Sequence, residues 1–488
     1  MGDVEKAAAA SQKSPAVSTT DDNLVDWDGP NDPTNPVNWP FRRRWLVTIS
    51  VAAFSFISPT STSMTAPALS SIGEDLNITS SFLLNLTLSS FILAYAFGPF
   101  AVAPLSEVYG RVKVLQVSNI LYLFFNLGCG FAQNSAQLIV CRFFAGLGGS
   151  APLVIGAGVL ADCWRPEERG TAISLFTMVT LLGPTIGPIV GGFITQYSNW
   201  RWIFYSLTIA DAVIQVFSFL VLRETYAPKL LGDKARALRA ETGNDALYTK
   251  WEKGGRSMKI ILRTALARPF IFLFTQPICQ MLTLYVAYLY GLTYLMLTTF
   301  PSLWTGVYGE SISIGGLNYL SLGIGYAIGT QGTARINDII YRRLSAKSGT
   351  GAGQPEYRLP MLLVSAILVP IGLFWYGWSA EAQIQWIMPD IGAAIFGIGV
   401  RIGYQCCQVY VVDTYRTYAA SAGAVLVFLR SLAGFGFPLF APYMFDALGY
   451  GWGNSVLAFI AIFIGIPAPF ILWKWGPTLR KRSRYQIL

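Results

Sequence analysis

Residues 183–192 read Gly-Pro-Thr-Ile-Gly-Pro-Ile-Val-Gly-Gly, and they lie within an uncharged stretch that covers residues 171–195. In the interior of a soluble helix Gly costs about 1 kcal/mol and Pro about 3 kcal/mol. A membrane helix tolerates both, because neighbouring helices and Ser or Thr side chains satisfy the freed backbone groups. Gly183, Gly187 and Gly191 are four residues apart, so they share one face and let another helix approach closely. The stretch predicts a bent, closely packed transmembrane helix.

The composition places the whole chain in a membrane. Of its 488 residues, 53% are hydrophobic and 12% are charged, whereas soluble proteins carry roughly 25% charged residues. Apolar runs long enough to span a bilayer, which takes about 20 residues, recur along the sequence. They cover residues 45–68, 81–104, 114–132, 138–161, 171–195, 202–222, 269–298, 311–334, 359–377, 386–412, 420–443 and 453–473, with Pro277 as a candidate break. The sequence therefore predicts an all-α polytopic membrane protein with twelve transmembrane helices.

The runs form two blocks of six, separated by a hydrophilic segment. Two such blocks resemble the pseudo-symmetric halves of a secondary transporter. We therefore expect five parts along the chain. These are a cytosolic, partly disordered N-terminal tail (1–44), an N-terminal six-helix half (45–222), a cytosolic linker (223–268), a C-terminal six-helix half (269–473) and a basic cytosolic tail (474–488).

Lys and Arg are distributed unevenly between the two sides of this arrangement. Of the 35 Lys and Arg residues, 31 lie in the tails, the linker and alternate connections, and the exceptions are Arg142, Arg201, Arg401 and Arg430. Basic loops stay in the cytosol, so both termini are predicted to be cytosolic. The basic residues behind the net charge of +9 then set the orientation in the membrane and attract anionic lipid head groups. We expect no nucleic-acid binding. Asn77, in an Asn-Ile-Thr sequon, falls in an outward loop and is a candidate glycosylation site.

Several classes of active site are excluded by what the sequence lacks. It contains no His, which removes the usual zinc ligand sets and the Ser-His-Asp arrangement. It has no Walker A motif, so ATP hydrolysis is not expected. The six cysteines lie in or beside apolar runs without metal-ligand spacing. We expect neither an enzyme nor a bound metal or cofactor.

Three segments resemble motifs of one transporter family. Residues 103–113 (Ala-Pro-Leu-Ser-Glu-Val-Tyr-Gly-Arg-Val-Lys) resemble its signature loop between spans 2 and 3, residues 141–146 (Cys-Arg-Phe-Phe-Ala-Gly) its span-4 motif, and residues 183–192 its span-5 antiporter motif. Residues 27–33 and 223–228 are similar to fungal members. The chain thus resembles the fungal twelve-span drug:proton antiporters of the major facilitator superfamily. The resemblance implies the major facilitator fold.

The resemblance also implies roles for individual residues. It links Arg142 to proton transfer and Glu107 with Arg111 to a gating charge pair. In the signature loop Glu107 replaces the usual Asp, while Ala103 and Val108 also depart from the family pattern. The resemblance links the span-5 segment to export. The residues of this antiporter motif are Gly183, Pro184, Gly187, Pro188, Gly191 and Gly192.

Five ionisable residues lie inside the predicted spans: Arg142, Asp211, Asp390, Arg401 and Arg430. A charge at the centre of a bilayer costs about 2.5–3.5 kcal/mol or more, so each is a functional candidate. For each, the alternative is an internal salt bridge or a carbonyl-bound Arg that fixes helix packing. Asp211 is a candidate proton carrier, although structural pairing is the favoured interpretation, and Asp390 lies near the outer end of its span. Arg401 and Arg430 are candidates for holding a substrate anion.

Other polar and aromatic side chains occur on spans that should border a central cavity. Apolar pockets with a few polar groups suit amphipathic ligands, but aromatic residues in spans also serve packing and interfacial belts. The predicted cavity residues are Arg401, Arg430, Gln276, Gln280, Tyr285, Tyr288, Gln405 and Gln408, with Tyr95 and Tyr319 as further candidates.

Together these features predict a secondary active efflux transporter. We expect it to export small amphipathic organic compounds, with acidic metabolites or xenobiotics among them, in exchange for protons by alternating access. The alternative functions are a facilitative uniporter and a nutrient or organic-acid importer of the same fold. The expected partners are the substrate, protons and the lipid bilayer, and the expected state is a monomer. The expected location is the plasma membrane, with a vacuolar or vesicular membrane as the alternative.

Overall fold

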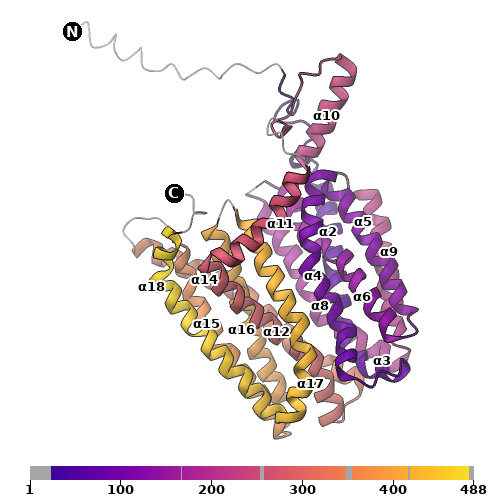
Figure 1. Ribbon diagram of the computed structural model, residues 1–488, viewed down its shortest axis with the longest axis vertical. Coiled ribbons are helices and arrows are strands. Elements are labelled where there is room, and N and C mark those ends of the chain that lie inside the picture. Colours follow the sequence, from indigo (N-terminus) through magenta and orange to yellow (C-terminus); the bar gives the residue numbers. More distant parts are fainter. Residues whose placement is uncertain (1–22, 166, 253–257, 348–353, 416–417, 483–488) are drawn as a thin grey trace, which may run out of the picture.

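The computed structural model describes residues 23–165, 167–252, 258–347, 354–415 and 418–482. Within these residues the regular secondary structure is helical, apart from an isolated bridge between Leu24 and Tyr248. Figure 1 shows the long helices packed side by side in two groups, coloured indigo to magenta for the first half of the chain and rose to yellow for the second. The all-helical fold class predicted from the sequence is confirmed.

The first half contains seven long helices for six predicted spans, because the fourth span is interrupted at Ser150. Its long helices are α2 (Phe41–Met64), α4 (Ser81–Tyr109), α5 (Arg111–Gly130), α6 (Ser135–Gly149), α7 (Ala151–Cys163), α8 (Arg169–Tyr197) and α9 (Arg201–Val221). The shorter elements are η1 (Pro36–Asn38), η2 (Ala66–Ala68) and α3 (Leu69–Asp75). Helix α8 continues through both of its prolines.

A small extramembrane unit joins the N-terminal segment to the linker. It contains α10 (Ala227–Thr242) and stands at one end of the bundle (Figure 1). The Val25 backbone N–H donates to the Tyr248 carbonyl at 2.8 Å, and Lys250 Nζ lies 2.6 Å from Asp26 Oδ2. The hydrogen bond from Lys250 lowers the pKa of Asp26. The two segments are therefore held together outside the bundle.

The second half begins with a broken span. Helix α11 (Met258–Thr275) ends before Gln276, whose φ of −112° and ψ of 99° are not helical, and α12 (Pro277–Ser302) follows. Proline lacks an N–H and disfavours a helical conformation in the residue before it, so the predicted break at Pro277 is confirmed. The remaining elements are η4 (Leu303–Val307), α13 (Ile312–Leu317), α14 (Tyr319–Lys347), η5 (Pro355–Arg358), α15 (Leu359–Glu381), α16 (Ile387–Thr414), α17 (Ala419–Gly465) and α18 (Pro467–Arg482).

Ten segments of the described residues are long and apolar enough to cross a membrane. The last, Ser421–Arg480, contains two predicted spans, because Gly449 has a non-helical φ of 71° and ψ of 177° and separates them. The predicted span 311–334 corresponds to α13 and the first part of α14, and it is not among the ten segments. Helix α14 continues into a basic segment with Arg335 and Arg342, which lowers its average hydropathy. Each of the twelve predicted spans therefore corresponds to helical structure.

The glycines of α8 form a seam with two neighbouring elements. A Cβ added at Gly191 would overlap the Met64 carbonyl oxygen of α2, and one at Gly192 would lie 2.8 Å from the Ile312 carbonyl oxygen of α13. Ser63 of α2 donates to the Gly183 carbonyl at 3.3 Å. The close helix approach predicted from the spacing is confirmed, and it joins α8 both to its own half and to the second half.

Candidate functional site

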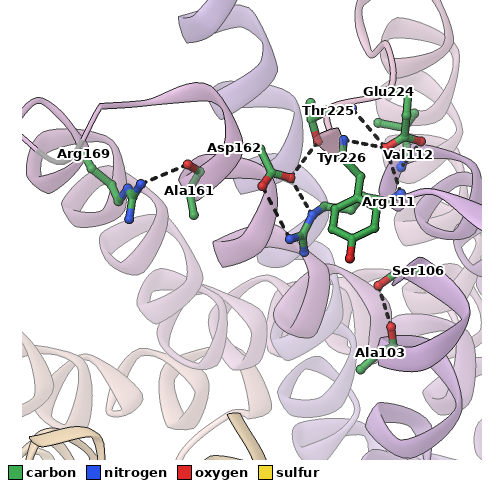
Figure 2. A network of polar contacts seen from close by, with 10 residues as sticks. All are labelled: Ala103, Ser106, Arg111, Val112, Ala161, Asp162, Arg169, Glu224, Thr225 and Tyr226. Atoms are coloured by element: carbon green, nitrogen blue, oxygen red, sulfur yellow. Dashed lines mark hydrogen bonds and ion pairs between the residues drawn. The ribbon is translucent and has the colours of Figure 1, made fainter. Parts of the chain in front are cut away.

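A group of charged side chains surrounds the N-terminus of α5 (Figure 2). Arg111 Nε lies 2.5 Å from Asp162 Oδ2 at the end of α7. Glu224 accepts hydrogen bonds from the backbone N–H groups of Arg111 and Val112 at 3.0 and 3.3 Å, so it caps α5. Gly110 has a φ of 99°, and a Cβ there would overlap the Glu224 carboxylate. This turn therefore requires glycine.

The expected partner of Arg111, Glu107, lies outside this group. Glu107 is exposed, and no ion pair joins it to Arg111 in the part of the chain that the structure describes. Arg111 pairs with Asp162 instead, and its guanidinium carbon lies 4.9 Å from the ring centre of Tyr226. Burial raises the pKa of Tyr226, and the charge of Glu107 raises it further. Sequence reasoning missed Asp162, which lies on a different helix.

Arg142 of α6 lies deep within the first half, with 1% of its surface exposed. Its guanidinium donates to the carbonyls of Thr87 and Ser61 at 3.3 and 3.1 Å and to the Thr65 hydroxyl at 3.0 Å. The guanidinium carbon lies 4.7 Å from the ring centre of Phe91. All of these partners are neutral. The arrangement is the carbonyl-bound alternative, and a role of Arg142 in proton transfer stays a prediction.

Asp211 of α9 is completely buried against α5. Its Oδ2 accepts a hydrogen bond from Asn119 Nδ2 at 2.9 Å, and Asn119 also donates to Gln215 at 2.9 Å. The other carboxylate oxygen of Asp211 has no hydrogen-bond partner, and neither do the Gln215 Nε2, Ser218 Oγ and Tyr122 OH atoms on the same two helices. Buried polar atoms normally have partners. The set therefore marks a polar site within an otherwise apolar bundle.

Polar contacts connect Arg142 to the same helix as Asp211. Arg142 Nη1 donates to Ser61 Oγ at 3.4 Å, and Ser61 Oγ donates to Asn126 Oδ1 at 3.5 Å. Asn126 Nδ2 donates to Thr208 Oγ1 at 2.9 Å, one turn before Asp211 on α9. The chain of contacts thus crosses from α6 through α2 and α5 to α9. Sequence reasoning selected Arg142 and Asp211 but missed Asn119 and Asn126, whose spacing of two turns on α5 was the available signal.

The second half contains a group that we call the Arg–Tyr cluster: Arg401, Arg430, Tyr290, Tyr326 and Tyr404, from α12, α14, α16 and α17. The guanidinium carbons of Arg401 and Arg430 lie 5.7 and 5.1 Å from the ring centre of Tyr404. Arg401 also lies 5.8 Å from the Tyr326 ring, and Arg430 lies 5.0 Å from the Tyr290 ring. The two cations therefore share one aromatic ring, and each has a second ring of its own.

Most donors of these two arginines are unused. Arg401 Nε donates to Thr330 Oγ1 at 3.3 Å, whereas Arg430 Nε is buried without a hydrogen-bond partner. Among the described residues no carboxylate pairs with either arginine. A guanidinium has five N–H donors arranged in a fork that matches planar anions. The cluster is suited to bind an anion that the chain itself does not supply. Sequence reasoning missed Tyr404, although it follows Arg401 by one turn on α16.

Three of the predicted cavity tyrosines are packed inside the second half instead. Tyr285, Tyr288 and Tyr319 are buried, and each hydroxyl contacts another helix. Their partners are Ser365 Oγ, the Leu457 carbonyl and the Leu297 carbonyl, at 3.0, 2.5 and 2.6 Å respectively. Tyr95 is likewise buried, and its hydroxyl contacts Ser58 in the first half. For these four residues the packing alternative fits the geometry.

The four predicted glutamines fall into two pairs. Gln276 is buried where α11 and α12 meet, and Gln280 is exposed and donates to the Leu273 carbonyl at 2.8 Å. Gln405 and Gln408 follow Arg401 on α16 at spacings that place them on the same helix face. This second pair therefore shares a helix with Arg401 and Tyr404 of the Arg–Tyr cluster. The sequon residue Asn77 is exposed after α3, with a φ of 53°.

Comparison with known families and proteins agrees with this architecture. The model of the Major Facilitator Superfamily matches residues 51–438. The chain is 50% identical to the efflux pump vrtL of Penicillium aethiopicum, over 99% of this chain and 96% of that protein. It is 41% identical to the efflux pump radE of Floropilus chiversii, over 98% of this chain and 89% of that protein.

Solved structures share the fold at low sequence identity. The xylose transporter XylE from E. coli, in a partially occluded inward-open conformation, aligns with a TM-score of 0.66 and 15% identity, over 89% of this chain and 98% of that one. A bacterial homologue of the human lysosomal transporter Spinster, in an inward-facing conformation, aligns with a TM-score of 0.64 and 14% identity, over 91% and 99%. These likenesses support the twelve-helix fold alone.

Proposed function

This chain belongs to the Major Facilitator Superfamily, and we propose that it exports small acidic organic compounds in exchange for protons. Its family and its relatives are those of multi-pass membrane transporters rather than enzymes. Two relatives bear the name efflux pump, and the span-5 segment resembles an antiporter motif. Both facts support export over import.

The Arg–Tyr cluster is the observation that best supports an acidic cargo. Arg401 and Arg430 face the same Tyr404 ring and have no carboxylate partner among the described residues. Two cations without counter-ions are costly in an apolar environment, and a bound carboxylate, phenolate or sulfonate offsets that cost with charge-assisted hydrogen bonds. The tyrosine rings offer aromatic cargo a flat apolar surface.

The contacts between the halves suit alternating access. On one side α8 packs against α13, where Gly316 and Pro188 approach closely. On the other, Phe100 and Phe97 of α4 contact Phe428 of α17 with ring centres 5.5 and 5.9 Å apart. The phenylalanine contact is apolar, and at the α8–α13 contact the Ser313 backbone N–H donates to Gln196 Oε1 at 2.8 Å. Among the described residues no ion pair joins the halves at either contact. The two contacts therefore support an exchange between two states in which either side separates.

The test of cargo class is uptake into inside-out membrane vesicles, with two probes of opposite charge on one aromatic body. Naphthalene-1-sulfonate is the anion, and N,N,N-trimethylnaphthalen-1-aminium is the cation. We expect the chain to accumulate the anion, and the double variant Arg401→Gln/Arg430→Gln to lose at least tenfold in uptake rate. Each lost charge-assisted bond is worth about 1.5–3 kcal/mol, and about 1.4 kcal/mol is a factor of ten.

Arg335→Gln is the matched control, because Arg335 is an exposed arginine of α14 outside the cluster. Its uptake should equal that of the unchanged chain. Equal accumulation of both probes, or an unchanged rate in the double variant at equal protein level, would contradict the acidic cargo. Faster uptake in right-side-out vesicles would favour the importer.

For proton exchange we propose Asp211 as the group that takes up and releases the proton. It is buried, it has one oxygen without a partner, and no Lys or Arg pairs with it among the described residues. A buried carboxyl without a cation is a position where a proton can be held, and the polar contacts from Arg142 reach the same helix. These contacts support proton carriage by Asp211 in addition to its hydrogen bond with Asn119.

An imposed pH gradient tests this role. In inside-out vesicles an acidic lumen should accelerate uptake of naphthalene-1-sulfonate, whose charge is constant over the tested range. Asp211→Asn keeps the shape of the side chain, and we expect it to remove the acceleration while gradient-free exchange persists. Asp446→Asn, at an exposed carboxylate, is the control. Uptake that ignores the gradient in the unchanged chain would favour a uniporter.

We also propose the membrane placement. Helix α10, with Lys229, Lys234, Arg236 and Arg239, lies at the end of the bundle where α2 begins, which supports cytosolic termini (Figure 1). Exposure of Asn77 at the other side supports glycosylation there. We propose a monomer in the plasma membrane. Deglycosylation of the surface-labelled chain, with Asn77→Gln as the control, tests whether Asn77 lies on the outer side of the membrane and whether it is glycosylated.

A further inference from the structure

A groove of about 540 Å³ lies between α13, α14 and the start of α16. The residues that line it are largely apolar, and several are exposed. Ile314 and Ile324, for example, have 50% and 56% of their surface exposed. Its volume is within the range of about 300–1,000 Å³ that is usual for small-molecule sites. The groove is separate from the Arg–Tyr cluster, and none of its lining residues belongs to that cluster.

Two carboxylates line this apolar groove. Asp390 is 7% exposed, and its Oδ1 has no hydrogen-bond partner. Glu310 accepts a hydrogen bond from Asn318 Nδ2 at 2.7 Å, and burial raises the pKa of Glu310. Neither carboxylate pairs with a Lys or Arg among the described residues. A buried acceptor without a partner is costly, so a cation that donates hydrogen bonds would complete the site.

A metal ion is a poor match for this arrangement. Within the described residues no group of three or more His, Cys, Asp or Glu side chains comes together, whereas Ca²⁺ takes six to eight oxygen ligands and Mg²⁺ requires octahedral oxygens. An ammonium group needs only a few acceptors and tolerates apolar surroundings on its carbon side. Trp386 at the groove adds an aromatic face for a cation.

We propose that this groove binds a single-chain amphiphile with a protonated primary amine, such as a sphingoid base. The ammonium would lie between Asp390 and Glu310, and the hydrocarbon chain would follow the apolar wall along Ile324 and Ile391. A net positive ligand without phosphate is favoured, because two carboxylates would repel a phosphate group. This inference is independent of the proposed export function.

Binding of tritiated sphinganine to the purified full chain in phosphatidylcholine nanodiscs tests the site by scintillation proximity. Dodecylamine should displace the label, and dodecanol, which has the same chain without the charge, should not. We expect Asp390→Asn and Glu310→Gln each to weaken binding at least tenfold. Asp446→Asn removes an exposed carboxylate of α17 and should leave binding unchanged.

Three results would overturn the proposal: displacement by dodecanol equal to that by dodecylamine, displacement by phosphatidylethanolamine at the same concentration, or unchanged binding in both groove variants. Folding of the variants is checked separately by their elution on size exclusion and by their thermal unfolding. Glu310→Lys provides a further variant, since a reversed charge should abolish amine binding and admit dodecyl sulfate instead.

Discussion

Arg142 in the first half and the pair Arg401 and Arg430 in the second are all arginines inside membrane-spanning helices, but their surroundings differ. Arg142 is 1% exposed and donates to neutral acceptors on neighbouring segments. Arg401 has one hydrogen bond to Thr330, and Arg430 Nε has none. The first arginine completes the hydrogen bonding of the fold. The second two have few hydrogen-bond partners among the described residues, and this difference is the basis of the roles proposed for them, structural for Arg142 and ligand-binding for Arg401 and Arg430.

The largest expected effect follows from removing the satisfied arginine. Arg142→Gln leaves the buried acceptors of Ser61, Thr65 and Thr87 without their donor, and bonds to a charged group are worth about 1.5–3 kcal/mol each. We expect the free energy of unfolding to fall by at least about 3 kcal/mol, measured by thermal unfolding in detergent. Arg142→Lys keeps the charge but loses the fork, and should fall in between.

An effect on transport without an effect on stability would contradict the structural role of Arg142. If Arg142→Gln kept the thermal stability of the unchanged chain and lost only the response to a pH gradient, Arg142 would act in proton transfer rather than in packing. The motif resemblance would then describe the residue better than its contacts do.

Two glycines of α8 also differ in how closely other atoms pack against them. Gly191 faces the Met64 carbonyl so closely that an added Cβ would overlap it, whereas Gly170 has nothing within 4 Å of an added Cβ. We expect Gly191→Ala to destabilise the fold by about 1–3 kcal/mol through overpacking. Gly170→Ala is the control on the same helix and should be neutral or slightly stabilising. Equal melting temperatures of the two variants would show that the seam has room to relax.

The sequence predicts the positions of the helices well because apolar length and charge are local properties. Pro277 also predicts the break in the seventh span, since its effect acts on the preceding residue. The interruption at Ser150 also had a signal, because Gly148 and Gly149 precede it and Pro152 follows within the first turn of α7, but the sequence analysis did not use it.

The site was predicted only in part because ion pairs and hydrogen bonds depend on how distant helices meet. The motif placed Glu107 and Arg111 four residues apart, but the structure pairs Arg111 with Asp162 of another helix. In the same way, Arg401 and Arg430 were recognisable as charges in apolar runs. The shared Tyr404 ring required the relative placement of α16 and α17, which spacing alone does not give.

A smaller effect is expected from Tyr404, whose ring both Arg401 and Arg430 contact. Tyr404→Leu removes a face that both guanidinium groups contact, and a cation–π contact is worth about 0.5–2 kcal/mol. We expect the KM for naphthalene-1-sulfonate to rise roughly twofold to thirtyfold, measured by vesicle uptake. Tyr404→Phe keeps the ring and should stay near the original value. If Phe failed as badly as Leu, the hydroxyl rather than the ring would position the cargo.

The smallest expected effect concerns stability without cargo. Arg430→Gln should change the free energy of unfolding by less than about 0.5 kcal/mol, or raise it slightly, because it removes one of two like charges that face Tyr404 and breaks no ion pair found among the described residues. Added cargo should then distinguish Arg430→Gln from the unchanged chain by melting temperature. A ligand that binds only the folded state at 100 times its Kd stabilises it by about 2.7 kcal/mol, so naphthalene-1-sulfonate should raise the melting temperature of the unchanged chain and not of Arg430→Gln. A large loss of stability in the absence of the anion would instead place Arg430 in the same structural class as Arg142.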